Sequence, residues 1–202
     1  MSVLINGLEA ITKSVAQIQD WTAVAQNTIG ESATYNFANV RSAILNIQAG
    51  LDTTTAHTGT KFIVQISSAT SGDEDWQNYT SFVALIGTAV TDLIENNPLA
   101  AGSTAITLTT HGYTVLGKWL LIEDGTLINS ELVFESAQAA DVVTILDCTT
   151  NAHAVNTAMF NVAMVQNVTI TSSVNRLRVL VDNTYDNDGS TLNYKVRISI
   201  IT

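Results

Sequence analysis

Residues 192–200 read LNYKVRISI, and this stretch decides the fold class of the chain. Apolar residues stand at every second position from Leu192 to Ile200, with polar residues between them. A period of two is typical of a β-strand with one buried and one exposed side. Similar short runs, separated by clusters of Gly, Asn, Asp and Ser, occur at residues 40–49, 62–67, 80–87, 165–170 and 176–181. The sequence therefore predicts an all-β protein, a β-sandwich of which the jelly roll is one form.

The middle of the chain has a different pattern. Its only proline, Pro98, follows two asparagines and marks a boundary. Short strand signals then follow at residues 100–109, 118–123, 131–135 and 142–146, with a turn at Asp124-Gly125. We interpret residues 96–161 as a small β-barrel inserted into an outer sandwich of residues 33–95 and 162–202. The ends of such an insert should lie close together, as tolerated insertions require.

The first 32 residues leave three interpretations open. Leu8, Ile11, Val15 and Ile18 have the spacing of a short amphipathic helix. Residues 21–26 alternate instead and favour a strand. The third interpretation is an extended arm that packs on a neighbouring subunit. We treat residues 1–32 as an N-terminal arm or the first strands, and expect contacts between subunits to order them.

Composition excludes several classes of function. Hydrophobic residues make up 46% of the chain and charged residues only 13%, against roughly 25% in ordinary soluble domains. The net charge is −10 with eight Lys and Arg, and there is no basic stripe, so binding to nucleic acid or to an anionic membrane is not expected. Arg176 and Arg178 should be exposed together on one face of a strand. No apolar stretch approaches about 18 residues, and the first residues do not resemble a cleavable secretion signal.

The single cysteine, Cys148, rules out a disulfide within the chain. It lies at the end of the apolar run 142–148, VVTILDC, which reads as a strand. We therefore expect a buried, inert thiol.

No catalytic motif is present in the sequence. His57, His111 and His153 stand beside Thr, Ala or Gly rather than beside carboxylates, and we interpret His57 and His153 as loop residues. The sequence has no HExxH, CxxC or GxSxG motif, no phosphate-binding loop and no dinucleotide fingerprint. We expect neither an enzyme nor a cofactor.

One acidic turn has the residue types of a calcium site. Asp182, Asp186 and Asp188 are weak candidate ligands, because carboxylates close together around a turn are hard oxygen ligands. An ordinary hairpin turn is the favoured interpretation of the same residues. Likewise Trp21, Trp76 and Trp119 are interpreted first as core residues and second as a platform for sugars.

Several turns resemble those of structural proteins of tailed bacteriophages, of the head decoration or auxiliary capsid type. The segments that carry this resemblance are 55–66, 72–76, 179–186 and 188–191, together with 101–104 and 151–161 at the two ends of the insert. The resemblance spans most of residues 40–202 and brings no active-site residues with it.

The resemblance implies a subunit that is assembled in the host cytoplasm and located in the virion. Its partners would be the major capsid protein or other virion proteins, which it would bridge as a capsid decoration or cementing homo-oligomer, with a trimer favoured. A tail, neck or head-fibre component of the same particle is the alternative. A glycan-binding receptor module is the second alternative.

Overall fold

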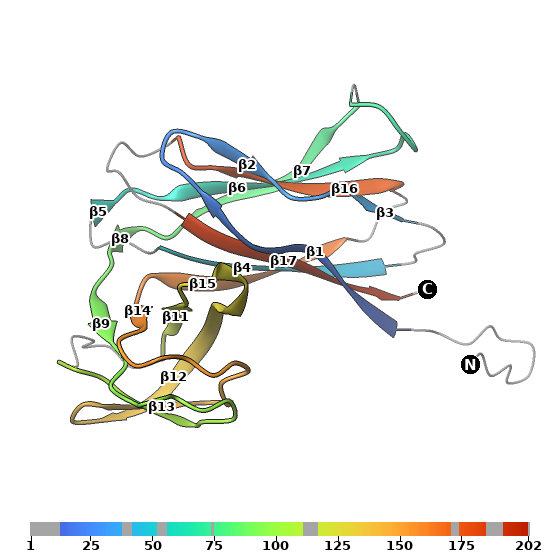
Figure 1. The fold of residues 1–202 in the computed structure, drawn as a ribbon. Helices are drawn as coiled ribbons and strands as arrows, with labels where there is room; N and C mark the ends of the chain where they lie inside the picture. Colours follow the sequence, from blue (N-terminus) through green and yellow to red (C-terminus); the bar gives the residue numbers. More distant parts are fainter. Residues whose placement is uncertain are drawn as a thin grey trace, which may run out of the picture.

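The protein is described by a computed structural model, which covers residues 13–37, 42–51, 56–73, 75–110, 117–170, 174–184 and 192–201. Within these ranges the regular secondary structure is β-strand apart from the short 3-10 turn η1 (Leu127–Asn129), and every strand pairing is antiparallel. Figure 1 shows two stacked layers of strands with a smaller group of strands beneath the lower layer. The predicted all-β class is confirmed.

The two stacked layers form the sandwich. One layer has the strand order β1 (Lys13–Val24), β17 (Leu192–Ile201), β4 (Ser42–Leu51) and β15 (Ala163–Ile170). The other has the order β2 (Ile29–Glu31), β16 (Arg176–Asp182), β6 (Thr60–Ser67) and β7 (Gln77–Ala84), and β3 (Tyr35–Asn36) also pairs with β16. A two-stranded ribbon of β5 (Ala56–His57) and β8 (Gly87–Thr88) lies beside them.

The order of these strands is that of a jelly roll. Leaving out β3, the first strand of the sandwich pairs with the last, the second with the second-last, and so on inward to the β6–β7 hairpin. The chain is thus one long antiparallel ribbon whose two halves fold over each other, which is how a jelly roll forms two sheets from eight strands. The jelly-roll form of the predicted sandwich is the one that the chain adopts.

The alternation that predicted β17 also explains the core. Leu192, Tyr194, Val196 and Ile198 point between the layers and are buried, whereas Arg197 and Ser199 are exposed on the outer face. Asn193 and Lys195 depart from this pattern, since both are buried although they belong to the polar side of the strand. Lys195 lines a small cleft with Ile128 and Ser130, so the turn between β11 and β12 covers it.

The strands beneath the sandwich form a barrel. Their order is β10 (Ala105–Thr107), β13 (Val142–Ile145), β12 (Glu131–Ala139), β11 (Trp119–Glu123), β14 (Ala158–Phe160) and β9 (Thr91–Leu93). A bridge between Ile94 and Leu108 joins the two outermost strands. Backbone hydrogen bonds on either side of this bridge, from Glu95 N to Thr107 O (2.8 Å) and from Thr109 N to Leu93 O (3.0 Å), close the sheet on itself.

The barrel has a hydrophobic core of its own, formed by Ile94, Leu99, Ile106, Leu108, Leu120, Ile122, Val133, Val143, Ile145 and Met159. It lies in the connection between β7 and β15, and its first strand begins at Thr91. The division into an insert of residues 96–161 and an outer sandwich stays a prediction.

Close packing of β11 against β4 holds the barrel to the sandwich. Leu120 and Ile122 point into the barrel, while Leu121 between them points outward and joins the core of the sandwich. A Cβ atom added to Gly50 of β4 would lie only 2.8 Å from Cβ of Leu121. The missing side chain at Gly50 therefore permits this close approach.

Two predictions about individual residues are wrong, and one of the three interpretations left open for the first 32 residues is excluded in part. The helix considered for residues 7–18 is contradicted over residues 13–18, which begin β1 and pair with β17; residues 7–12 lie outside the described ranges. Strand pairing over the whole length of β17 overrides the helical spacing. Cys148 is exposed, because β13 ends at Ile145 and the chain then bends outward with Leu146 66% exposed. Arg176 is buried rather than exposed.

Candidate interaction surface

The two lateral sides of the sandwich differ in how their edge strands are protected. On one side the edges are β1 and β2. Strand β1 has two register shifts against β17 and contains Asp20, which pairs with Lys195 at 2.9 Å. Strand β2 has only three residues and contains Glu31, which pairs with Arg178. Bulges, charges and very short strands are the features by which proteins prevent another chain from pairing with a sheet edge.

The opposite side lacks these charges. Its edges are β7 and β15, each eight residues long, with the sequences QNYTSFVA and AMVQNVTI. Neither strand contains Lys, Arg, Asp, Glu or Pro. The pairing of β15 with β4 runs without a register shift from Ala163 to Ile170, whereas β7 has one register shift against β6, between Val64 and Gln65. This side is the open edge of the sandwich, a name we keep for β7 and β15 together.

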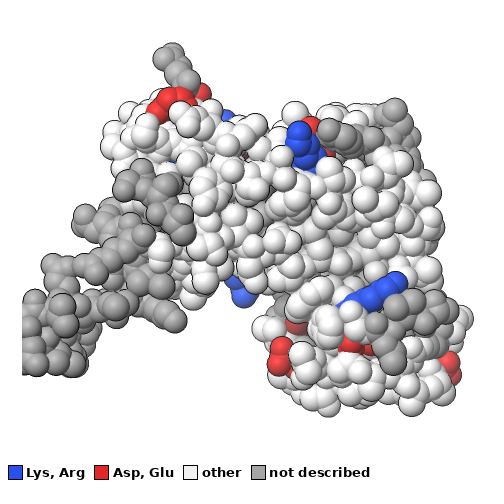
Figure 2. Space-filling view, turned by 180° about the vertical axis from the view of Figure 1, so that it is seen from behind, with Lys and Arg blue, Asp and Glu red and all other residues white. Residues whose placement is uncertain are grey.

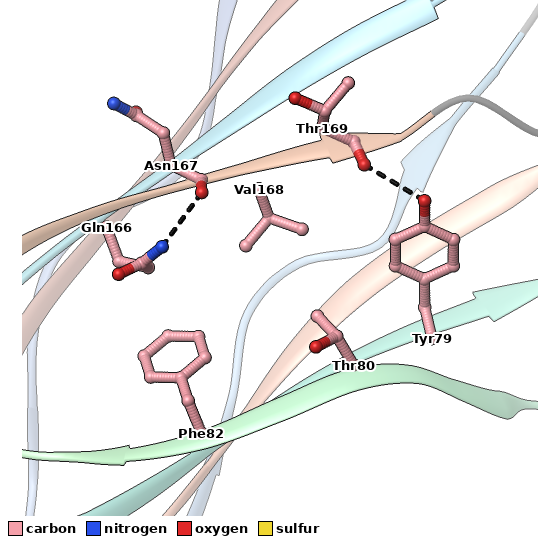
Figure 3. Close-up of a pocket in the computed structure, with 7 residues that line it drawn as sticks. All are labelled: Tyr79, Thr80, Phe82, Gln166, Asn167, Val168 and Thr169. Atoms are coloured by element: carbon pink, nitrogen blue, oxygen red, sulfur yellow. Dashed lines mark hydrogen bonds between the residues drawn. The ribbon is translucent and has the colours of Figure 1, made fainter.

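A groove of about 400 Å³ runs between the two strands of the open edge. It is lined by Tyr79, Thr80 and Phe82 of β7 and by residues 166–169 of β15. Figure 3 shows Phe82 and Val168 extending toward each other from the two strands. Both side chains are half-buried and pack at the margin of the sandwich core. The groove therefore exposes part of the core between two uncharged walls.

Two hydrogen bonds show which way the backbone of β15 points. The Tyr79 hydroxyl donates to the carbonyl oxygen of Thr169 (3.0 Å), and the Gln166 side-chain amide donates to that of Asn167 (3.0 Å), both drawn in Figure 3. These carbonyls belong to alternate residues and point away from β4. In an antiparallel strand the N–H and C=O groups of one residue point to the same side. The N–H groups of Asn167 and Thr169 therefore also point out of the open edge.

The predicted calcium site is described only in part. Asp182 ends β16, and its Oδ1 accepts hydrogen bonds from the backbone N–H (3.0 Å) and the hydroxyl of Thr184. Asp186 and Asp188 lie outside the described ranges. Within those ranges no three His, Cys, Asp or Glu side chains are placed to hold a metal ion. The calcium prediction stays untested.

His57 is buried in a polar network and is not a loop residue as predicted. It lies in β5, and its Nδ1 accepts a hydrogen bond from the backbone N–H of Gly59 (2.8 Å). Its Nε2 is 3.3 Å from Oδ1 of Asn183, which also accepts from the Thr60 hydroxyl (2.9 Å). The network links β5 and β6 to the end of β16. His111 lies outside the described ranges.

His153 lies between two carboxylates that the sequence did not associate with it. It is 1% exposed, with Nε2 at 2.7 Å from Glu131 and Nδ1 at 3.1 Å from Asp124. The two acids stand at either end of the turn between β11 and β12. Each ring nitrogen faces a carboxylate oxygen, so neither is available to a metal ion. The predicted turn at residue 124 was a signal that these acids are near each other, but nothing in the sequence indicated His153.

The pKa values of this cluster favour the charged pair. Burial by itself disfavours the imidazolium, but hydrogen bonds and charges from Glu131 and Asp124 outweigh burial and raise the pKa of His153 above its ordinary value. Burial alone would raise the pKa of Glu131. Hydrogen bonds from His153 and from the backbone N–H groups of Thr150 and Asn151 reverse this effect and lower that pKa.

The three tryptophans have different environments. Trp21 is buried in the sandwich core, as predicted, and Trp119 packs edge-on against Phe134 with ring centroids 5.2 Å apart. Trp76 instead packs against the guanidinium groups of Arg176 (4.7 Å) and Arg178 (4.3 Å). Arg176 is buried because its guanidinium also donates to backbone carbonyls of the turn after β6.

Comparisons with known proteins give no family. No family model and no curated protein sequence matches the chain. Among solved structures, VP17, a capsid protein of bacteriophage P23-77, is similar at 10% identity and a TM-score of 0.21, covering 96% of this chain and 99% of that one. The VP2 subviral particle of infectious bursal disease virus is similar at 8% identity and a TM-score of 0.24, covering 98% of this chain and 44% of that one. At these TM-scores neither likeness carries an argument about this chain.

Within the described ranges, no helix has the length and apolarity that spanning a membrane requires.

Proposed function

We propose that this chain is a virion structural protein of a tailed phage, a capsid decoration or cementing protein that bridges capsid subunits through contacts of its β-sandwich. The observation that carries the proposal is a jelly roll with one protected side and one uncharged open edge. Jelly rolls form viral capsid domains as well as lectins and cupins, so the fold alone assigns no function. The open edge adds a surface suited to assembly with other protein chains.

The low charge of the chain supports the same proposal. On the face shown in Figure 2 the Lys, Arg, Asp and Glu side chains are few, and most of the surface belongs to other residues. Stable assembly interfaces bury large, shape-matched areas whose centres are depleted of charge. When symmetry repeats such an interface over a particle, modest contacts add to a strong attachment. The turns that resemble those of tailed-phage structural proteins agree with this role.

Cryo-electron microscopy of the virion that carries this chain tests the proposal. We expect density for the jelly roll and its barrel on the capsid lattice, in contact with several capsid subunits. Density confined to the tail, neck or a fibre would contradict the decoration role and favour the alternative, a tail, neck or head-fibre component. Absence of the chain from purified virions, measured by mass spectrometry, would contradict a virion role altogether.

The glycan-binding alternative has less support, because Trp21 is buried and the Trp76 ring is covered by two arginines. A glycan array probed with and without calcium tests it directly. Binding of a defined glycan would reverse this ranking.

A further inference from the structure

We propose that the open edge is a homodimer interface. Strand β15 pairs antiparallel with β15 of a second copy, and β7 pairs with β7 of the same copy, about one two-fold axis perpendicular to the layers. Each layer then continues from one molecule into the next. This inference goes beyond the proposed function, since it concerns the purified chain whatever particle contains it.

The first step is the direction of the backbone. The C=O and N–H groups of Asn167 and Thr169 point away from β4, as their carbonyl contacts with Gln166 and Tyr79 show. These are the groups that a further antiparallel strand would bond. The Gln166 side chain is exposed and can turn aside when a backbone N–H replaces its amide. Addition of a strand to a sheet edge is a common mode of protein recognition.

The second step is charge. Two copies that each carry −10 repel one another over most approaches. The open edge places no charged residue of β7 or β15 at the contact, so the repulsion there is small. The opposite side carries the ion pairs Asp20–Lys195 and Glu31–Arg178, whose charges would lose contact with water in an interface. An acidic copy of the same chain therefore approaches most favourably through the open edge.

The third step is the number of edges. A single extended peptide could pair with β7 or with β15, but not with both, because they belong to different layers. A partner that pairs with both strands must itself present two strand edges, separated by the same distance as β7 and β15 and running in the same relative direction. A second copy does so by definition, and one two-fold axis perpendicular to both sheets makes both pairings antiparallel. The same contact covers Phe82 and Val168 in the groove.

Sedimentation equilibrium of the purified chain over a range of concentrations tests the proposal. We expect a species of twice the 21.6 kDa chain mass that dissociates on dilution. A chain with Asn167→Lys and Thr169→Lys, both exposed on β15, should raise the dissociation constant at least tenfold. The reason is that like charges meet across the new strand pair.

The matched control carries the same two charges on the other edge of the same sheet. Val15→Lys with Gln17→Lys places lysines two residues apart at exposed positions of β1. This chain should dimerise like the unchanged protein. Thermal melting of all three chains verifies that each is folded, and the substituted positions are exposed in both variants.

Amide hydrogen exchange followed by NMR gives a second readout. The amides of Asn167 and Thr169 should exchange more slowly as the protein concentration rises, and those of Val15 and Gln17 should not change. A monomer at every concentration, a trimer as expected from the sequence, or equal loss of association in the two lysine variants would each overturn the proposal. None of these results bears on whether the chain occurs in virions, so the two proposals fail separately.

Discussion

His153 ties together three segments of the barrel that are distant in the sequence. Its ring is held between Asp124 at the end of β11 and Glu131 at the start of β12, and its backbone pairs with Leu99. Glu131 in turn accepts hydrogen bonds from the backbone N–H groups of Thr150 (2.7 Å) and Asn151 (3.2 Å). The cluster therefore fixes the loop before β14 on the turn that follows β11.

Replacing His153 by Ala should destabilise the protein by about 3–5 kcal/mol at pH 6, because it leaves two carboxylates close together without their cation. Urea unfolding at that pH measures the loss. Adding Glu131→Gln to the His153→Ala chain should recover part of it, since one of the uncompensated charges is then removed. Equal stability of the unchanged and His153→Ala proteins would contradict the ionic role of the cluster.

The same cluster predicts a dependence of stability on pH. The raised pKa of His153 means that its ionic contribution is fully present below the ordinary value of 6.5 and is lost as the pH rises through the higher folded-state pKa. The lowered pKa of Glu131 means that its contribution is present above 4.5 and is lost as the pH falls through the lower folded-state pKa. The cluster should thus stabilise the fold most between about pH 4.5 and 6.5.

Urea unfolding of the unchanged protein and of His153→Gln from pH 4 to pH 9 tests this dependence. The difference in unfolding free energy should be largest near pH 6 and should narrow at high pH. A difference that stays constant across the range would show that His153 acts by packing alone.

Among the elements, β11 is packed on both of its faces, and this sets the position of the barrel. Leu121 fills the space above Gly50 of β4, while its neighbours in sequence belong to the barrel core. Phe160 of the adjacent strand β14 also joins the sandwich core. The two cores are therefore separate clusters that meet along one pair of barrel strands.

Gly50→Ala should destabilise the protein by about 1–3 kcal/mol, because the new methyl group would lie 2.8 Å from Leu121 Cβ and 2.9 Å from its Cδ2. Thermal unfolding measures the change. Adding Leu121→Ala should remove part of the penalty by relieving the overlap. Gly125→Ala is the control, since nothing lies within 4 Å of the added atom and its backbone does not require glycine; a similar loss in the control would contradict the role of the junction.

Local patterns predicted the strands well where one face is buried and the other is exposed. The runs at 62–67, 165–170, 176–181 and 192–201 correspond to β6, β15, β16 and β17. The prediction failed where a strand ended earlier than its apolar run, as at Cys148, or where pairing overrode a helical spacing, as in β1. A period gives the direction of side chains, but the partner strand decides where the pairing ends.

The polar clusters could not be predicted from the sequence, for a related reason. His153 is separated from Asp124 and Glu131 by more than twenty residues, and the three meet only because β11 pairs with both β12 and β14. Similarly, the sequence shows that β7 and β15 contain no charged residue. This absence indicates an edge open to another chain only when the topology shows that both strands are edges on the same side of the sandwich.

At the scale of the whole molecule, the barrel enters and leaves the sandwich through neighbouring strands. Thr91 of β9 pairs with Phe160 of β14, and the backbone N–H of Val90 donates to the Asn161 side chain at 2.8 Å. The two ends of the barrel segment are therefore adjacent, and the chain enters and leaves the barrel at the same place on the jelly roll.

A fragment of residues 90–161 should fold by itself, because it contains all six barrel strands and their whole core cluster. Dispersed amide signals in the NMR spectrum of the fragment would show a folded barrel. Its stability should be lower than that of the barrel in the full chain, since Leu121 and Phe160 would be exposed to water. A fragment without dispersed signals would show that the barrel needs the sandwich to fold.

The barrel packs against only the layer that contains β4 and β15, so one side of the molecule carries the barrel and the other side does not (Figure 1). The two sides offer different shapes to whatever lies below or above them. A coat assembled from such subunits would have different inner and outer surfaces. The difference would be present in each subunit before it meets a neighbour, because its two sides differ in shape.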